Sequence, residues 1–162
     1  MLATLANSVS LPSAKETRLV RSISHTIEID APPEAVWGEL ADTGAYAGWN
    51  PFVRRLDGPL EKGARLDVEI EPPGDRAMTF RPTVLEARPG RELRWLGHLL
   101  FPGLFDGEHS FEIEPLGQGR SRLTQSERFS GLLVRPFGGS LEKTERGFEA
   151  MNRALKARVE AT

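Results

Sequence analysis

A regular alternation of apolar and charged positions marks the C-terminal part of the chain, residues 137–161. Apolar side chains recur there every three or four residues, so they lie on one face of a helix, and charged side chains occupy the other face. The apolar face is formed by Phe137, Leu141, Phe148, Met151, Leu155 and Val159. We therefore predict one long helix whose apolar face is buried against another part of the fold.

Most of the preceding chain shows the shorter period of a β-strand, in which every second residue is apolar. Residues 21–30 and 105–114 follow this pattern, and a glycine-containing turn at 116–119 joins the second of these segments to residues 123–129. Similar segments lie at 52–56, 65–71, 78–87 and 91–97. The pattern predicts seven strands, most of them joined as hairpins.

Proline residues mark two interruptions of this strand pattern. Between the first two strands, Pro32-Pro33 suits a helix start and is followed by apolar residues at helical spacing, with a second helical turn expected at 45–48. Pro82 lies inside the segment 78–87. Because proline has no amide hydrogen to donate to a neighbouring strand, we expect a bulge or broken pairing there.

Together, these elements predict an α+β domain in which the long helix covers one face of a curved antiparallel sheet. A helix is roughly 10 to 12 Å across, which is too narrow to fill a strongly curved sheet of seven strands. We therefore expect a cavity between the sheet and the helix. The domain is assigned to residues 21–162, and residues 1–20 are expected to form an N-terminal tail.

Several short segments carry a family resemblance. They are Val36-Trp37, 42–46, Trp49-Asn50-Pro51-Phe52, Leu93-Arg94-Trp95, 107–115 and 127–131. In these segments the chain resembles the SRPBCC group, which includes START-related lipid-transport proteins, birch-pollen allergens and polyketide cyclases/dehydrases. The resemblance extends over about residues 21–160 and implies a helix-grip fold, in which a seven-stranded antiparallel sheet wraps around the C-terminal helix and encloses a hydrophobic ligand cavity. It implies no fixed catalytic residues, because members of the group bind, carry or cyclise different molecules.

Composition narrows the choice of partners. The chain has 21 Lys and Arg residues against 23 Asp and Glu residues, so its net charge of -2 gives no electrostatic reason to expect nucleic acid or an anionic membrane as a partner. It contains no cysteine, which excludes disulfides and thiolate metal sites and fits a cytoplasmic location. No apolar run reaches the roughly 18 residues that suggest a membrane-spanning helix.

Three polar residues fall on the predicted inward face of the last hairpin: His109, Gln125 and Glu127. A carboxylate at such a position loses hydration unless it is paired or protonated, so Glu127 is the strongest candidate for a functional group. It could anchor a ligand, act with His109 as an acid/base pair, or form an internal structural pair. No set of histidine and acidic residues has the spacing of a metal site, and no cofactor is predicted.

Aromatic and other large apolar residues supply the rest of the predicted cavity wall. Those expected on the facing surfaces of sheet and helix are Trp49, Phe80, Trp95, Phe111, Phe148 and Met151. The loop from residue 99 to residue 105 is also unusually apolar, and Phe101 and Phe105 are predicted to form a gate or a contact with a partner.

Three functions are open from the sequence. The first is a soluble binding protein for a small hydrophobic molecule, such as a lipid or a polyketide-like compound. The second is a polyketide aromatase/cyclase or dehydratase-type enzyme, in which Glu127 and His109 transfer protons. The third is a regulatory module that binds another protein through its apolar loop.

Overall fold

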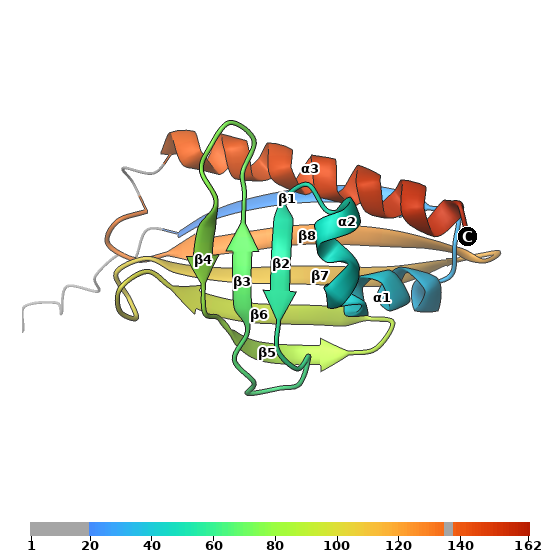
Figure 1. Cartoon of the computed structure of the whole chain (residues 1–162), viewed down its shortest axis with the longest axis horizontal. Coiled ribbons are helices and arrows are strands. Elements are labelled where there is room, and N and C mark those ends of the chain that lie inside the picture. The colour runs from blue at the N-terminus through green and yellow to red at the C-terminus, as the bar shows by residue number, and fades with distance from the viewer. Residues whose placement is uncertain (1–19, 135–137) are drawn as a thin grey trace, which may run out of the picture.

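The predicted C-terminal helix is present as α3, Gly138–Glu160, and it lies along one side of an antiparallel sheet (Figure 1). The computed structural model describes residues 20–134 and 138–162. Of the predicted tail at 1–20, only Val20 belongs to this described part, and Phe137 lies outside it as well. The end of α3 agrees with the prediction to within one residue.

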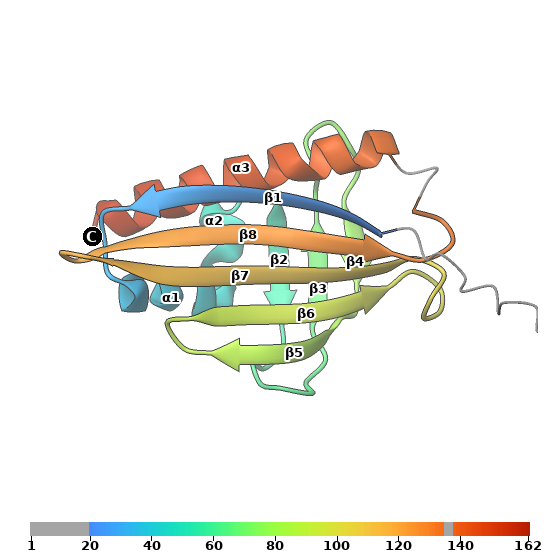
Figure 2. The ribbon, with the colours of Figure 1, turned by 180° about the vertical axis from the view of Figure 1, so that it is seen from behind.

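Two antiparallel sheets and three short helical segments complete the described fold. The strands are β1 Val20–Ile29, β2 Val53–Asp57, β3 Asp67–Ile70, β4 Met78–Phe80, β5 Thr83–Arg88, β6 Glu92–His98, β7 Asp106–Gly117 and β8 Arg120–Ser130. The helical segments after β1 are α1 Pro33–Ala41, the 3-10 turn η1 Thr43–Ala45 and α2 Tyr46–Trp49. The larger sheet has the strand order β1-β8-β7-β6-β5, and the smaller sheet, β2-β3-β4, crosses over one face of it (Figures 1 and 2).

The α+β helix-grip arrangement is therefore confirmed, but the prediction of seven strands in one sheet was wrong in its number. Pro82 explains the difference, since β4 ends at Phe80 and β5 begins at Thr83. The carbonyl oxygen of Pro82 still accepts a hydrogen bond from the amide of Leu66, at 2.9 Å. The break in pairing predicted at this proline is confirmed, and it divides one predicted strand between the two sheets.

The long hairpin of β7 and β8 determines which side chains meet in the interior. Its register places His109 opposite Glu127 and Phe111 opposite Gln125. On the other side of β7, His109 lies opposite Trp95 of β6. Neighbouring residues in register point to the same face of a sheet, so these side chains form one connected group.

Asn50 turns the chain from α2 into β2. Its fully buried side-chain oxygen, Oδ1, accepts hydrogen bonds from the backbone amides of Phe52 and Val53, at 3.0 and 2.9 Å. This turn directs the Phe52 ring towards α3, where it packs edge-on against Phe148 with ring centroids 5.5 Å apart. The Trp49-Asn50-Pro51-Phe52 segment therefore has a structural role in joining the smaller sheet to the long helix.

Within residues 20–134 and 138–162, no helix has the length and apolar character needed to cross a membrane.

Replacing Gly147 of α3 by alanine is expected to lower the free energy of unfolding by about 1 to 3 kcal/mol, because overpacking a filled core forces its neighbours to move. The added Cβ would lie 2.2 Å from Cδ2 of Phe52. The matched control is Gly38→Ala in α1, where a Cβ meets no atom within 4 Å. There, helix propensity should add up to about 1 kcal/mol of stability. Urea denaturation measures both changes, and a stabilised Gly147→Ala variant would contradict the described packing of Phe52.

Candidate functional site

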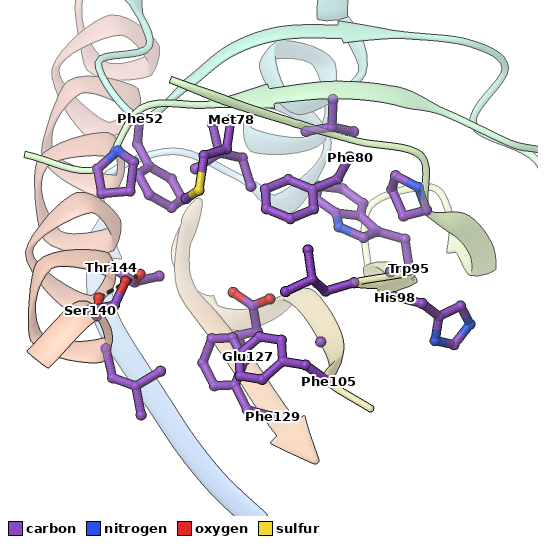
Figure 3. Close-up of a pocket in the computed structure, with 18 residues that line it drawn as sticks. Phe52, Met78, Phe80, Trp95, His98, Phe105, Glu127, Phe129, Ser140 and Thr144 are labelled. Atoms are coloured by element: carbon purple, nitrogen blue, oxygen red, sulfur yellow. Dashed lines mark hydrogen bonds between the residues drawn. The ribbon is translucent and has the colours of Figure 1, made fainter. Parts of the chain in front are cut away.

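A cavity of about 170 Å³ lies between the first turns of α3, the smaller sheet and one end of β6, β7 and β8 in the larger sheet (Figure 3). The smaller sheet contributes Val68, Ile70, Met78 and Phe80, the larger sheet contributes Trp95, Glu127 and Phe129, and α3 contributes Ser140, Leu141 and Thr144. This lining is mostly apolar, as expected for a site that takes a hydrophobic molecule.

Glu127 is the only acidic residue among the described residues that line the cavity, and no lysine or arginine is among them. Its side chain extends from β8 into the cavity and keeps 14% of its surface exposed (Figure 3). One carboxylate oxygen, Oε2, lies 3.5 Å from Nδ1 of His109. The predicted pair of Glu127 and His109 is therefore present, with Glu127 in the cavity lining and His109 behind it.

Gly107 provides the room that the Glu127 carboxylate occupies. A Cβ atom at this position of β7 would lie 2.6 Å from Oε1 of Glu127, which is closer than real Cβ contacts come. The absence of a side chain at Gly107 therefore allows the carboxylate to lie across the strand. The alternating sequence of β7 gave no reason to single out this glycine as part of the site.

His109 is held rigidly behind the cavity wall, and 1% of its side chain is exposed. Its ring stacks on Trp95, with centroids 4.8 Å apart and planes 5° apart, and meets Phe148 edge-on at 5.1 Å. The side-chain nitrogen of Gln125 lies 3.1 Å from Nε2 of His109 and 3.6 Å from the sulfur of Met151. Glu127, His109 and Gln125 thus form a polar chain that runs from the cavity into the core.

Both ring nitrogens of His109 have a polar neighbour in this chain. Both neighbours of the Gln125 amide nitrogen, Nε2 of His109 and the Met151 sulfur, can accept a hydrogen bond from it. An imidazole that accepts at Nε2 carries its proton on Nδ1, which is the nitrogen that faces Glu127. Such an arrangement can pass a proton between His109 and a molecule bound beside Glu127.

The structure places the predicted site residues in three groups. Phe80, Trp95, Glu127 and the predicted gate residue Phe105 line the cavity. The residues that lie in the packed core, outside the lining, are His109, Phe111, Gln125, Phe148 and Met151. Trp49 is also outside it and packs edge-on against Tyr46, and Phe101 is 58% exposed at the surface.

Several lining residues had not been predicted. Val68 and Ile70 could have been found from the alternating pattern of their strand, since both lie on its apolar face. Met78, Ser140 and Thr144 gave no such signal, because they belong to a short edge strand and to the first turns of the helix. Their part in the cavity depends on how the smaller sheet and α3 are placed over the larger sheet.

The loop between β6 and β7 closes one end of the cavity. Asp106 holds it, because its carboxylate accepts hydrogen bonds from the amide of Gly103, at 2.9 and 3.0 Å, and contacts Nδ1 of His98 at 2.7 Å. Phe105 packs against Phe129 with ring centroids 5.5 Å apart. The role of Phe105 and Phe101 as a gate stays a prediction.

In the described part of the chain, no group of three or more His, Asp or Glu side chains lies close enough together to hold a metal.

Comparison with known protein families identifies the fold's relatives. Residues 20–160 match the model of the family described as polyketide cyclase/dehydrase and lipid transport. The chain belongs to this family. The resemblance to the SRPBCC group seen in the sequence is thereby confirmed, and a search of curated proteins gave no match.

Solved structures with the same fold include three bacterial proteins. The Zhui aromatase/cyclase from Streptomyces sp. R1128 is 19% identical, with a TM-score of 0.65 over 88% of this chain and 94% of that one. A START superfamily protein from Mycobacterium smegmatis is 24% identical, with a TM-score of 0.65 over 86% of this chain and 97% of that one. A hypothetical protein from Helicobacter pylori is 19% identical, with a TM-score of 0.70 over 98% of this chain and 99% of that one. These similarities support the shared fold.

Replacing Gly107 by alanine is expected to displace the Glu127 carboxylate from His109, because the new Cβ would lie only 2.6 Å from Oε1. The imidazole nitrogen shifts of His109 in an NMR spectrum should report the lost contact. Gly97→Ala is the matched control, since Gly97 pairs with Gly107 across the sheet and its added Cβ would approach no atom more closely than 3.7 Å. Unchanged His109 shifts in Gly107→Ala would contradict the described position of Glu127.

Proposed function

We propose that this chain binds a small hydrophobic molecule, such as a lipid or a polyketide-like compound, in the cavity beside Glu127. The observation that carries the proposal is a cavity of about 170 Å³ whose lining is mostly apolar. Membership of a family described by polyketide chemistry and lipid transport supports the same class of ligand. Apolar cavities with a few polar groups are the usual form of small-molecule sites.

The packing of α3 supports a site at one end of the helix. Beyond Gly147, the inward side chains of Phe148, Met151 and Leu155 are completely buried. Before Gly147, Leu141 and Thr144 face the cavity. The space for a ligand therefore lies beside the first turns of α3, at this end of the fold.

Filling this space should prevent binding. Thr144→Phe is expected to weaken binding of 1-naphthylmethanol, a neutral fluorescent probe, at least about tenfold, which corresponds to about 1.4 kcal/mol. The reason is that the new ring competes with the probe for the cavity. Fluorescence titration measures the dissociation constant, and thermal unfolding checks that the fold is kept.

The matched control for this change is Thr79→Phe, which adds the same ring to β4 at an exposed residue between the cavity-lining Met78 and Phe80. Successive residues of a strand point to opposite faces, so this ring should leave the cavity free. Equal binding by the wild type and Thr144→Phe would show that the probe binds elsewhere and would argue against the proposed site.

A second candidate is acid/base catalysis on a polyketide-like substrate, as an aromatase/cyclase or dehydratase. The specific observation that favours it is the contact between Glu127 and Nδ1 of the buried His109. A carboxylate and an imidazole at the wall of an apolar cavity can move protons on a bound carbonyl compound. His109 reaches such a compound through Glu127, because His109 itself lies behind the lining.

Glu127→Gln separates binding from catalysis. Glutamine keeps the size and hydrogen-bonding capacity of the side chain but removes the ionisable carboxyl, so a neutral probe should bind within about tenfold of the wild type. If the cavity is catalytic, ring closure of a linear poly-β-ketone should slow about 100-fold or more in the variant. Product formation followed by chromatography measures this rate, and equal rates with wild type and variant would exclude Glu127 as acid or base.

The remaining sequence-based predictions concern partners and location. An interaction with another protein is supported by the exposed side chains of Leu100 and Phe101 in the loop before β7. A cytoplasmic location is supported by the cysteine-free sequence. The lack of a nucleic-acid partner also stays a prediction.

A further inference from the structure

The charge of Glu127 is not balanced by the residues that line the cavity. Neither lysine nor arginine is found among the described lining residues. His98 does line the cavity, but its ring is turned away from the centre (Figure 3) and contacts Asp106 at 2.7 Å. A carboxylate that is largely removed from water needs a partner, because burying an unpaired charge costs several kcal/mol.

The nearest imidazole, that of His109, is buried behind the cavity lining and makes only a long contact with Glu127. The closest approach of its ring to Glu127 is 3.5 Å, whereas charge-assisted N–H···O⁻ bonds are about 2.7 to 2.9 Å long. Its other nitrogen lies 3.1 Å from the side-chain nitrogen of Gln125, so the imidazole is shared between two polar neighbours. An ammonium group bound in the cavity with a bond of the usual length would lie closer to the carboxylate than the imidazole does.

Four aromatic rings line the cavity together with the Glu127 carboxylate. Phe105 and Phe129 lie on one side of it and Phe80 and Trp95 on the other (Figure 3). The faces of aromatic rings attract cations, and ammonium ligands are commonly held by several rings together. A carboxylate in a cavity lined by aromatic rings presents two attractive features to the same positive charge.

From this arrangement we infer that the ligand carries a protonated amine, which binds the Glu127 carboxylate, while its apolar body fills the cavity towards Met78 and Leu141. The inference rests on the proposed function, because it assigns the chemical class of the molecule held in that same cavity. It favours hydrophobic amines over neutral compounds. It disfavours fatty acids and other carboxylates, because their negative charge would face Glu127 with no cation among the described lining residues.

Three probes that share one ring system test this inference: 1-naphthylmethylamine, 1-naphthylmethanol and 1-naphthoate. At neutral pH they present an ammonium, a hydroxyl and a carboxylate on the same apolar body. The wild type should bind the amine at least about tenfold more tightly than the alcohol, and the carboxylate most weakly. Fluorescence titration at fixed ionic strength measures all three dissociation constants.

Substitutions in the protein test which residues cause the preference for the amine probe. Glu127→Gln should abolish the preference for the amine while the alcohol still binds. Glu112→Gln is the matched control, because it removes the same charge from an exposed position of β7, and it should keep the preference. Phe105→Leu keeps an apolar side chain but removes one ring, and should reduce the preference about threefold, so it tests the inference independently if Glu127→Gln does not fold.

The outcomes separate the inference from the proposed function. If the alcohol binds in the cavity and the amine binds no better, the ligand class is overturned and the proposed function stands. If the amine preference survives in folded Glu127→Gln, the positive charge binds elsewhere and the inference is overturned. If none of the three probes binds the wild type, both the proposed function and the inference are contradicted.

Discussion

The contact between the Phe52 ring and Gly147 determines how closely the long helix can approach the smaller sheet. Beyond this point the inward face of α3 is filled by completely buried side chains such as Phe148 and Met151. Before it, the first turns of the helix face open space. Because Gly147 has no side chain, the helix packs closely against the Phe52 ring, and the interior beyond this point is filled. One helix cannot cover the whole sheet, so a cavity is left at the other end.

The chemistry of this cavity follows from the register of three neighbouring strands. Trp95, His109 and Glu127 lie side by side across β6, β7 and β8, so a stacked imidazole connects an aromatic wall to a carboxylate. Gly107 leaves space for that carboxylate. The site thus depends on His109 in β7, on Glu127 in β8 and on the small residue Gly107 beside them. A change at any of these positions alters the charge or the shape of the cavity.

The hydrophobic pattern predicts much of this fold. It is sufficient for α3, for the two short helices before β2 and for the inward position of His109, Gln125 and Glu127, because all of these depend on local periodicity. It does not predict that Pro82 separates two sheets rather than bending one. That outcome depends on how the segments on either side of the proline find their partners, which is a tertiary property.

The cavity was less predictable than the fold for a related reason. Local patterns indicate which residues face inward, but they do not distinguish an inward residue that borders empty space from one that is packed on all sides. Phe111 and Phe148 face inward and lie in the filled core, whereas Phe80 and Trp95 line the cavity. The difference arises from the position of the smaller sheet over the larger one.

A crystal structure determined under xenon pressure tests the central claim most directly, because xenon enters apolar cavities and marks their position. The described structure predicts xenon density bounded by Phe80, Trp95 and Leu141, with the carboxylate of Glu127 facing it and remaining beside Nδ1 of His109. Absence of xenon there, with side chains of α3 and β4 filling the space, would contradict the account.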